Sequence, residues 1–282
     1  IFYTLQEPPI EQCSWDPDAQ TWTMGTTSFR RTIREGVVEV DIQFDCQLHG
    51  LPDRLTGSLN LSGPLRRHDH GETTRSDDHT WEPISLGGTQ ATLNVQSGDW
   101  QASVQGRAYH DRNGGRIPLQ QQGIRRWHWG RFAFPDREVV LYLVEHDDGS
   151  SAWTWLEVDA DGHCEQLSVL NVEHRDSRRS IYGPAWSRSI VVTAESGRTV
   201  HVRQDAPVDN GPFYLRHLAT AQVGDQTAHG ITELVESDRV DMAIHRPLVK
   251  MRIDTNHPSI WLPLFQGPSH GRVGRLFRSW LS

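Results

Sequence analysis

The chain has 282 residues, of which 36% are hydrophobic and 23% are charged, a composition that is ordinary for a soluble globular protein. Its formal net charge of −8 argues against a general nucleic-acid-binding protein. Lys250 is the single lysine, and no glycine-rich fingerprint surrounds it. Schiff-base chemistry and a P-loop are therefore set aside.

The three cysteines, Cys13, Cys46 and Cys164, are odd in number and do not lie at metal-ligand spacing. This argues against a disulfide framework and against a cysteine zinc site, and it fits a reducing compartment. No signal-peptide pattern opens the sequence, and no apolar run approaches about 18 residues. We therefore expect a cytoplasmic protein with no membrane-spanning helix.

Alternating apolar and polar residues predict β-strands along most of the chain. The clearest pattern runs from Val38 to Leu48, where every second residue is apolar. Glycine- and aspartate-rich turns separate further predicted strands. These strands cover residues 91–95, 100–108, 139–145, 190–195, 199–203 and 231–236. Helical periodicity is scarce, and residues 272–281 are the best helix candidate.

Strands at intervals of roughly ten residues, separated by Gly/Asp turns, predict an all-β protein built as an antiparallel sandwich or barrel. The length allows one large domain or two smaller ones. Arginines and Pro184 interrupt the apolar pattern between residues 175 and 184. We therefore place a domain boundary there, giving an N-terminal domain of residues 1–178 and a C-terminal domain of residues 179–282.

The segment from Leu65 to Thr80 is rich in charged residues. His68-Asp69-His70 within it has two histidines at i and i+2, which could chelate a metal if the segment were a strand. No HExxH or comparable pattern supports a metal here. A solvated loop is the favoured interpretation, and no metal site is predicted.

A dense group of aromatic, acidic and imidazole side chains begins at Tyr109-His110-Asp111 and continues with Trp127-His128-Trp129. In a strand, residues i and i+2 point to the same face. Tyr109 and Asp111 should therefore share a face, as should Trp127 and Trp129, while His110 and His128 have the opposite parity and are expected to be structural. The pairs His79/Trp81 and Trp153/Trp155 repeat this spacing.

The order His79-x-Trp81, then Tyr109-x-Asp111-x-Asn113, then Trp127-His128-Trp129-Gly130-Arg131 resembles the acyclic carotenoid 1,2-hydratase family of the hydroxyneurosporene synthase type. The resemblance is clear over residues 75–145. One departure is Gly114, where the family pattern leads us to expect an aromatic residue after the asparagine, and this bears on the shape of the pocket.

The resemblance implies two lipocalin-like antiparallel β-barrel or sandwich domains side by side. It also implies a hydro-lyase that adds water to a terminal isoprenoid C=C bond of an acyclic carotenoid-like substrate without a cofactor. Carried over by position, the catalytic residues are Asp111, His79, Tyr109 and Trp81. Substrate binding falls to Trp127, Trp129, Arg131 and Asn113.

The residues fit such chemistry on their own terms. Hydration of an unactivated alkene begins with a proton on carbon, and a carboxyl group in an apolar pocket is a plausible donor because desolvation raises its pKa. Asp111 has that role, Trp81, Trp127 and Trp129 stabilise the cation through their π faces, and His79 accepts a proton from the attacking water. The structural alternatives are a hydrogen-bonded wall histidine and an aspartate that caps the turn 113–115.

Two other functions remain open on the same scaffold. A pericyclase, cyclase or isomerase would use the aromatic pocket to fold a hydrophobic polyene, and a lipid carrier would bind without turnover. Activity that survives loss of the Asp111 carboxyl group favours the second class over hydration. Burial of a ligand with no product identifies the third.

A carotenoid-like substrate resides in a bilayer, so we expect a hydrophobic small-molecule partner and peripheral contact with the inner membrane. Residues 260–265 and 272–281 mix aromatic and aliphatic side chains with arginines, which suits a membrane interface. The alternative is a terminal segment that closes the protein core. No nucleic-acid partner is expected.

Overall fold

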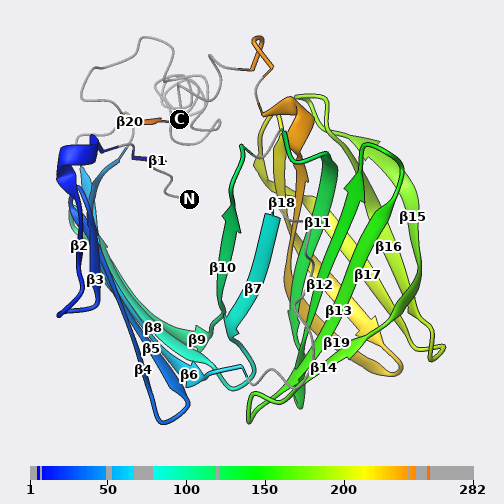
Figure 1. Cartoon of the computed structure of the whole chain (residues 1–282), viewed down its shortest axis with the longest axis horizontal. Helices are drawn as coiled ribbons and strands as arrows, with labels where there is room; N and C mark the ends of the chain where they lie inside the picture. Colours follow the sequence, from blue (N-terminus) through cyan, green and yellow to red (C-terminus); the bar gives the residue numbers. More distant parts are fainter. Residues whose placement is uncertain are drawn as a thin grey trace, which may run out of the picture. The chain divides into compact units, whose positions relative to one another are not determined.

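The computed structural model describes residues 5–6, 8–48, 53–66, 79–118, 121–240, 242–245 and 253–254, and strands dominate these residues (Figure 1). Two short 3₁₀ helices, η1 (Ile10–Gln12) and η3 (Ser237–Arg239), lie wholly within the described part. The predicted all-β fold is confirmed. The predicted helix at 272–281 and the His68-Asp69-His70 segment lie outside the described residues.

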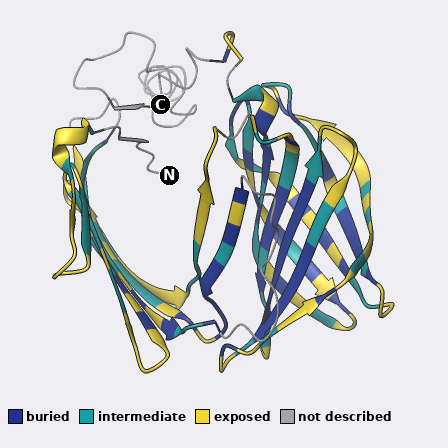
Figure 2. Cartoon of the chain, in the orientation of Figure 1, coloured by how far each residue is buried: buried dark blue, intermediate teal, exposed yellow. Residues whose placement is uncertain are grey.

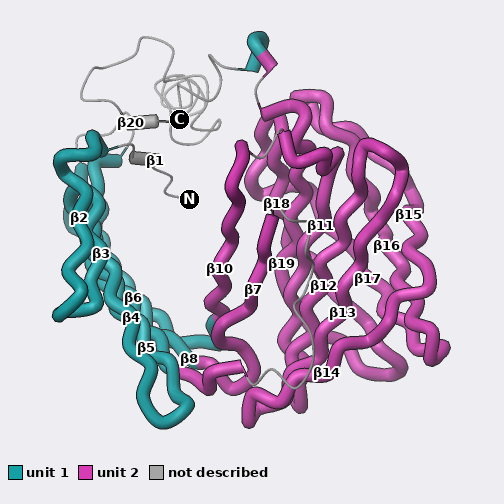
Figure 3. Tube along the Cα trace, viewed as in Figure 1, with its two compact units in different colours: residues 1–62, 90–108, 243–282 teal, residues 63–89, 109–242 magenta. Residues whose placement is uncertain are grey.

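The chain forms two compact units (Figure 3). Unit 1 comprises residues 1–62, 90–108 and 243–282, and unit 2 comprises residues 63–89 and 109–242. The predicted boundary after residue 178 falls near the end of an exposed edge strand, residues 169–179, whose hydrogen-bonded neighbour, residues 185–194, belongs to the same sheet. The arginines of this stretch are therefore the solvent-facing side chains of an edge strand.

Unit 1 is built on a seven-stranded sheet in the order β2-β3-β4-β5-β6-β8-β9. The alternating segment predicted at 38–48 is β5, and a turn at residues 98–99 joins β8 to β9. The strand bounds are β2 (Cys13–Asp16), β3 (Thr21–Met24), β4 (Thr27–Arg34), β5 (Val37–Gln47), β6 (Arg54–Pro64), β8 (Gln90–Ser97) and β9 (Trp100–Arg107). Two-residue strands β1 (Leu5–Gln6) and β20 (Ile253–Asp254) pair in parallel.

Unit 2 contains a nine-stranded sheet in the order β14-β13-β12-β11-β19-β18-β17-β16-β15, and every neighbouring pair is antiparallel. The bounds are β11 (Ile124–Ala133), β12 (Arg137–His146), β13 (Ser151–Asp159), β14 (Cys164–Leu167), β15 (Val169–Arg179), β16 (Ala185–Ala194), β17 (Thr199–Asn210), β18 (Tyr214–Val223) and β19 (Gln226–Glu236). The strands predicted at 139–145, 190–195, 199–203 and 231–236 all lie in this sheet.

Both faces of the nine-stranded sheet are buried at its centre, as the dark strands of Figure 2 show for β12. Residues of β12 alternate between two apolar clusters, with Leu141 and Leu143 in the larger one and Val140, Tyr142 and Val144 in the smaller. Burial on both sides explains why β12 reads as an unbroken apolar run rather than an alternating one.

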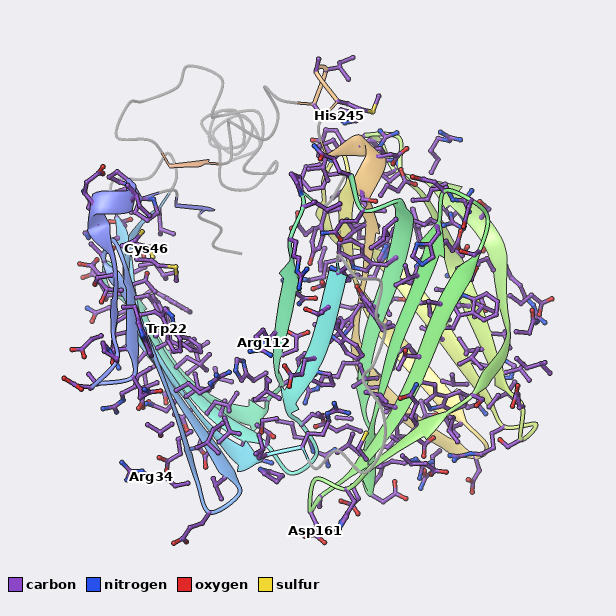
Figure 4. The ribbon with its side chains drawn as sticks, in the orientation of Figure 1. Trp22, Arg34, Cys46, Arg112, Asp161 and His245 are labelled. Atoms are coloured by element: carbon purple, nitrogen blue, oxygen red, sulfur yellow. The ribbon has the colours of Figure 1, made fainter. Side chains whose placement is uncertain are left out.

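A separate two-stranded pair covers part of the smaller cluster. It consists of β7 (His79–Ser85) and β10 (His110–Gly115), which run antiparallel. Trp81 of β7 and Tyr109, just before β10, pack against this cluster. Glu82 and the exposed Arg112 form an ion pair on the other side of this strand pair, and Figure 4 shows Arg112 pointing away from the nine-stranded sheet. The β7/β10 pair thus presents one apolar face to the nine-stranded sheet.

Candidate active site

A cavity of about 540 Å³ lies between the β7/β10 pair and the nine-stranded sheet of unit 2. Its walls carry six aromatic rings, counting the imidazole, together with two carboxylates and several small polar groups. The lining residues are His79, Trp81, Tyr109, Asp111, Asn113, Gly114, Gly115, Ile117, Gln122, Trp127, Trp129, Tyr142, Ile231 and Glu233. Seven of the eight residues predicted from the sequence are among them.

Asp111 is held in this cavity by two donors that meet at one oxygen. The Tyr109 hydroxyl and the Trp81 indole Nε1–H each donate to Asp111 Oδ2 at 2.8 Å. The register of β10 against β7 shifts between His110 and Asp111, and such irregularities re-aim side chains next to active sites. With Oδ2 anchored by both donors, the carboxyl group is held in one orientation within the cavity.

Tyr109 stays a neutral phenol under ordinary conditions. Burial, and then the negative charge of Asp111, raise the pKa of its hydroxyl well above the usual range. It therefore acts as a permanent hydrogen-bond donor to Asp111. The Tyr109 ring also contacts the Trp129 ring, with centroids 5.3 Å apart, which fixes the phenol between the carboxylate and the indole wall.

His79 and Tyr142 form a second polar pair in the same cavity. His79 Nε2 lies 2.6 Å from Tyr142 Oη, and both residues are buried. The Tyr142 ring stacks on Trp81 with centroids 4.7 Å apart, so the pair sits directly beside the Trp81–Asp111 hydrogen bond. Burial raises the pKa of the Tyr142 hydroxyl, and the charge of Asp111 adds to this effect.

Trp127 and Trp129 line the cavity together, as their i, i+2 spacing in β11 predicts. The Trp127 ring lies 5.9 Å from the His79 ring, centroid to centroid. Trp153 and Trp155 share the same spacing but belong to the larger cluster on the opposite face of the sheet. Spacing alone therefore identified pairs that share a face, and the sheet topology decides which face is the cavity.

Arg131 is the predicted binding residue that does not line the cavity. Its guanidinium donates from Nε at 3.0 Å and from Nη2 at 2.8 Å to the two oxygens of Glu138, whose side chain is 2% exposed. The guanidinium also lies 5.9 Å from the centre of the Tyr109 ring. Arg131 therefore contacts Glu138 and the Tyr109 ring, and it is not among the residues that line the cavity. Its i, i+2 spacing from Trp129 predicts a side chain on the cavity face, but the long side chain reaches Glu138 on the neighbouring strand.

Asn113 lines the cavity from β10, where it stands opposite Trp81 in the register. Next to it, a Cβ atom on Gly114 would meet Thr80 Oγ1 at 2.9 Å. That contact is with the end of a small side chain, so a larger residue at this point requires only a modest adjustment. Glycine here leaves the rim of the cavity wider than an aromatic residue would.

Sequence reasoning missed Tyr142 and Glu233. Tyr142 lies in the continuous apolar run of β12, which carries no alternation to mark a functional face. Glu233 of β19 lines the cavity and also forms an ion pair with Arg216. The register of the sheet places Trp129 opposite both Tyr142 and Glu233. Knowledge of this strand pairing would have identified the two residues.

His79 makes the stability of the protein depend on pH in a defined direction. Burial lowers the pKa of its imidazole below the ordinary value of 6.5. Below pH 6.5 the unfolded chain takes up a proton at His79 while the folded chain does not, so the folded state loses stability as the pH falls toward the folded pKa. We expect the melting temperature to fall less steeply below pH 6.5 in His79→Gln than in the wild type. Equal slopes in thermal melts would contradict the assignment.

The curled antiparallel sheet and its aromatic cavity define a lipocalin-like β-protein with an acid held against an apolar pocket. The chain belongs to the carotenoid hydratase CrtC family, whose sequence model matches residues 14–259. A hydroxyneurosporene dehydrogenase from Chlorobaculum tepidum is 31% identical over 139 residues. That match spans 46% of the chain and 36% of the relative, so the chain corresponds to about a third of the relative's length.

The fold is similar to that of a solved protein. The crystal structure of CghA superposes with a TM-score of 0.51 at 13% identity, covering 79% of this chain and 72% of that one. Kievitone hydratase from Nectria haematococca gives a TM-score of 0.40 at 9% identity, covering 84% of this chain and 98% of that one. Among the described residues, no helix has the length and apolarity needed to cross a membrane.

Proposed function

We propose that this protein is a hydratase that adds water to a terminal isoprenoid C=C bond of an acyclic carotenoid-like substrate, without a cofactor. The observation that carries the proposal is the Asp111 carboxyl group, fixed by Tyr109 and Trp81 in a cavity walled by indoles. Membership of the carotenoid hydratase family supports the reaction class.

The reaction begins with proton transfer from Asp111 Oδ1 to the less substituted alkene carbon. The π electrons of the double bond form the new C–H bond, Asp111 becomes a carboxylate, and the neighbouring carbon becomes a tertiary cation. The faces of Trp81, Trp127 and Trp129 and the new carboxylate stabilise that charge. The Tyr109 and Trp81 donors then hold the carboxylate in place for the next proton.

Water next adds to the cation, and the new C–O bond leaves a proton on that oxygen. In our proposal this proton passes to Tyr142 Oη while the Tyr142 proton passes to His79 Nε2, 2.6 Å away. The low pKa of buried His79 keeps its imidazole neutral and able to accept. The product is a tertiary alcohol, and the proton returns from His79 to Asp111 through solvent before the next turnover.

Tyr142→Phe tests this relay. The substitution keeps the ring that stacks on Trp81 and removes only the hydroxyl, so we expect turnover to fall at least about 10-fold. That is below the 10²–10⁴-fold typical of a group that transfers the proton to carbon directly. KM and the melting temperature should change little. Tyr182→Phe is the matched control, because Tyr182 does not line the cavity. Equal turnover in the two variants would show that Tyr142 takes no part in the proton relay.

Product analysis tests the function itself. Purified protein incubated with an acyclic carotenoid in detergent or liposomes should yield a product heavier by one water, and in ¹⁸O-labelled water the new hydroxyl should carry the label. A product of unchanged mass would instead favour an isomerase or cyclase. Substrate bound in stoichiometric amount without any product would favour a lipid carrier.

We also propose that the substrate reaches the cavity from a bilayer through peripheral contact with the inner membrane. The apolar and arginine-rich segments 260–265 and 272–281 lie outside the described residues, and their composition suits the interface. Deleting residues 271–282 should weaken binding to anionic liposomes several-fold. Unchanged binding by a folded truncation would assign the tail to the protein core, with substrate entering elsewhere.

A further inference from the structure

A second cluster of functional groups lies on the opposite face of the nine-stranded sheet from the cavity. His128 of β11 has the same parity as Phe132, and Glu145 of β12 has the same parity as Leu143, both members of the larger apolar cluster. His174 of β15 shares its face with Val172, which packs on the same cluster. None of the three lines the candidate active site.

These three side chains each offer one ligand atom, and the three atoms lie within 4.8 Å of one another. The His128 and His174 rings are 4.8 Å apart, centroid to centroid, and His174 Nε2 lies 3.8 Å from Glu145 Oε1. Small side-chain rotations would bring such atoms to about 2.0–2.2 Å from a shared ion, the bond length of imidazole and carboxylate ligands to zinc.

His128 supplies an independent reason to look for a ligand. It is 4% exposed, and neither of its ring nitrogens has a hydrogen-bond partner. A buried polar group without a partner destabilises the folded state. A bound cation would give one of these nitrogens a partner.

We propose that His128, Glu145 and His174 bind a divalent first-row transition metal, with Zn²⁺ as the ion best matched to two imidazoles and one carboxylate. Both imidazoles stay in the neutral form that binds metals. Burial, followed by neighbouring His174, Arg126 and His217, lowers the pKa of His128, and burial with Arg126 lowers the pKa of His174. Water or a further side chain would complete the coordination.

Two arginines oppose a cation at this point and limit its affinity. Arg126 Nη2 donates to Glu145 Oε1 at 2.8 Å, and Arg125 pairs with Glu145 Oε2. The Arg125 side chain is 55% exposed, so solvent screens it. Arg126 opposes cation binding more strongly, because it donates to Glu145 Oε1, the carboxylate oxygen that lies 3.8 Å from His174 Nε2. Replacing Arg126 should therefore strengthen metal binding, an effect opposite to that of removing a ligand.

The topology suggests what the metal would do. β15 is an edge strand of the sheet, whereas β11 and β12 lie in its other half, separated from β15 by β16 to β19. A metal shared by His174, His128 and Glu145 would tie that edge to strands with which it forms no ladder. It would stabilise the curl of the sheet in proportion to occupancy, because it binds the folded state and not the unfolded chain.

The test uses the full chain carrying no polyhistidine tag, stripped with a chelator and titrated with Zn²⁺. We expect one equivalent bound by calorimetry and by elemental analysis, with a melting temperature that rises with Zn²⁺ concentration. His174→Ala should weaken binding at least about 100-fold, since even loss of an outer partner of a ligand costs 10–100-fold. Arg126→Gln should bind several-fold more tightly than the wild type.

His163→Ala is the matched control. It removes the histidine of the exposed group Asp159, Asp161 and His163, which has similar ligand spacing but no buried imidazole, and it should keep both the affinity and the melting shift. If His174→Ala does not fold, Glu145→Gln serves in its place. Absence of Zn²⁺ binding by the wild type, or equal binding by the wild type and the ligand variants, would overturn the proposal.

Discussion

Asp111→Asn should lower turnover by at least about 10²-fold, the usual scale for a positioned general acid. The substitution is nearly isosteric. The amide oxygen of an asparagine can accept the two hydrogen bonds that Tyr109 and Trp81 now donate to Oδ2, so the melting temperature should change little. What the amide cannot do is donate a proton to an alkene carbon. Initial rates of alcohol formation, measured beside a thermal melt, test this expectation.

Asp136→Asn is the matched control for that substitution. Asp136 is exposed and pairs with its neighbour Arg137, so its variant should have wild-type turnover. If the turnover of Asp111→Asn stays within a few-fold of the wild type, protonation by Asp111 is contradicted. Such a result would favour a cyclisation or isomerisation that needs only the shape of the cavity. A variant that still binds substrate with unchanged affinity but makes no alcohol is the outcome we expect.

Arg131→Met should cost about 3–5 kcal/mol of folding stability, because it leaves the Glu138 carboxylate, 2% exposed, without its guanidinium partner. The free energy of unfolding from denaturant titrations measures this loss. KM should change little, because Arg131 contacts the Tyr109 ring and does not line the cavity. The double variant Arg131→Met/Glu138→Gln removes the unpaired charge and should recover much of the loss.

The opposite result would restore the role that the sequence motif suggested. If Arg131→Met changes stability by less than about 1 kcal/mol and raises KM strongly, the guanidinium contacts substrate. The distinction matters because the Trp129-Gly130-Arg131 motif reads equally well as a binding site or as a structural brace. Alternation places Arg131 on the same face as Trp129, yet its long side chain reaches Glu138 on the neighbouring strand.

Local alternation predicted the strands of this protein well, because a strand with one buried face has an apolar residue at every second position. Val37–Gln47 and Gln90–Ser97 emerged as strands from that pattern. It predicted the pairs His79/Trp81 and Trp127/Trp129 because each pair lies within one strand. Tyr109 precedes β10 and the register shifts between His110 and Asp111, so alternation does not explain why these two residues meet. One of the glycine- and aspartate-rich turns, Asp147-Asp148-Gly149, reverses the chain between β12 and β13.

What alternation cannot supply is the arrangement of strands that are distant in sequence. The chain enters unit 2 at residue 63, leaves it at residue 90 and returns at residue 109, so no single boundary describes its organisation. Tyr142 joins the site because the register sets it opposite Trp129. His174 meets His128 because the sheet curls, although the two lie at distant positions in the strand order. Such pairings follow from hydrogen-bonded ladders and not from composition.

Deuterium incorporation is the most direct test of the claim that Asp111 protonates the substrate. The wild-type protein, converting an acyclic carotenoid in D₂O, should place one deuterium on the carbon beside the new carbinol, because the Asp111 proton exchanges with solvent before each turnover. Mass spectrometry and NMR of the purified alcohol would locate the label. An alcohol formed in D₂O with no deuterium at that carbon would contradict acid-catalysed protonation as the first step.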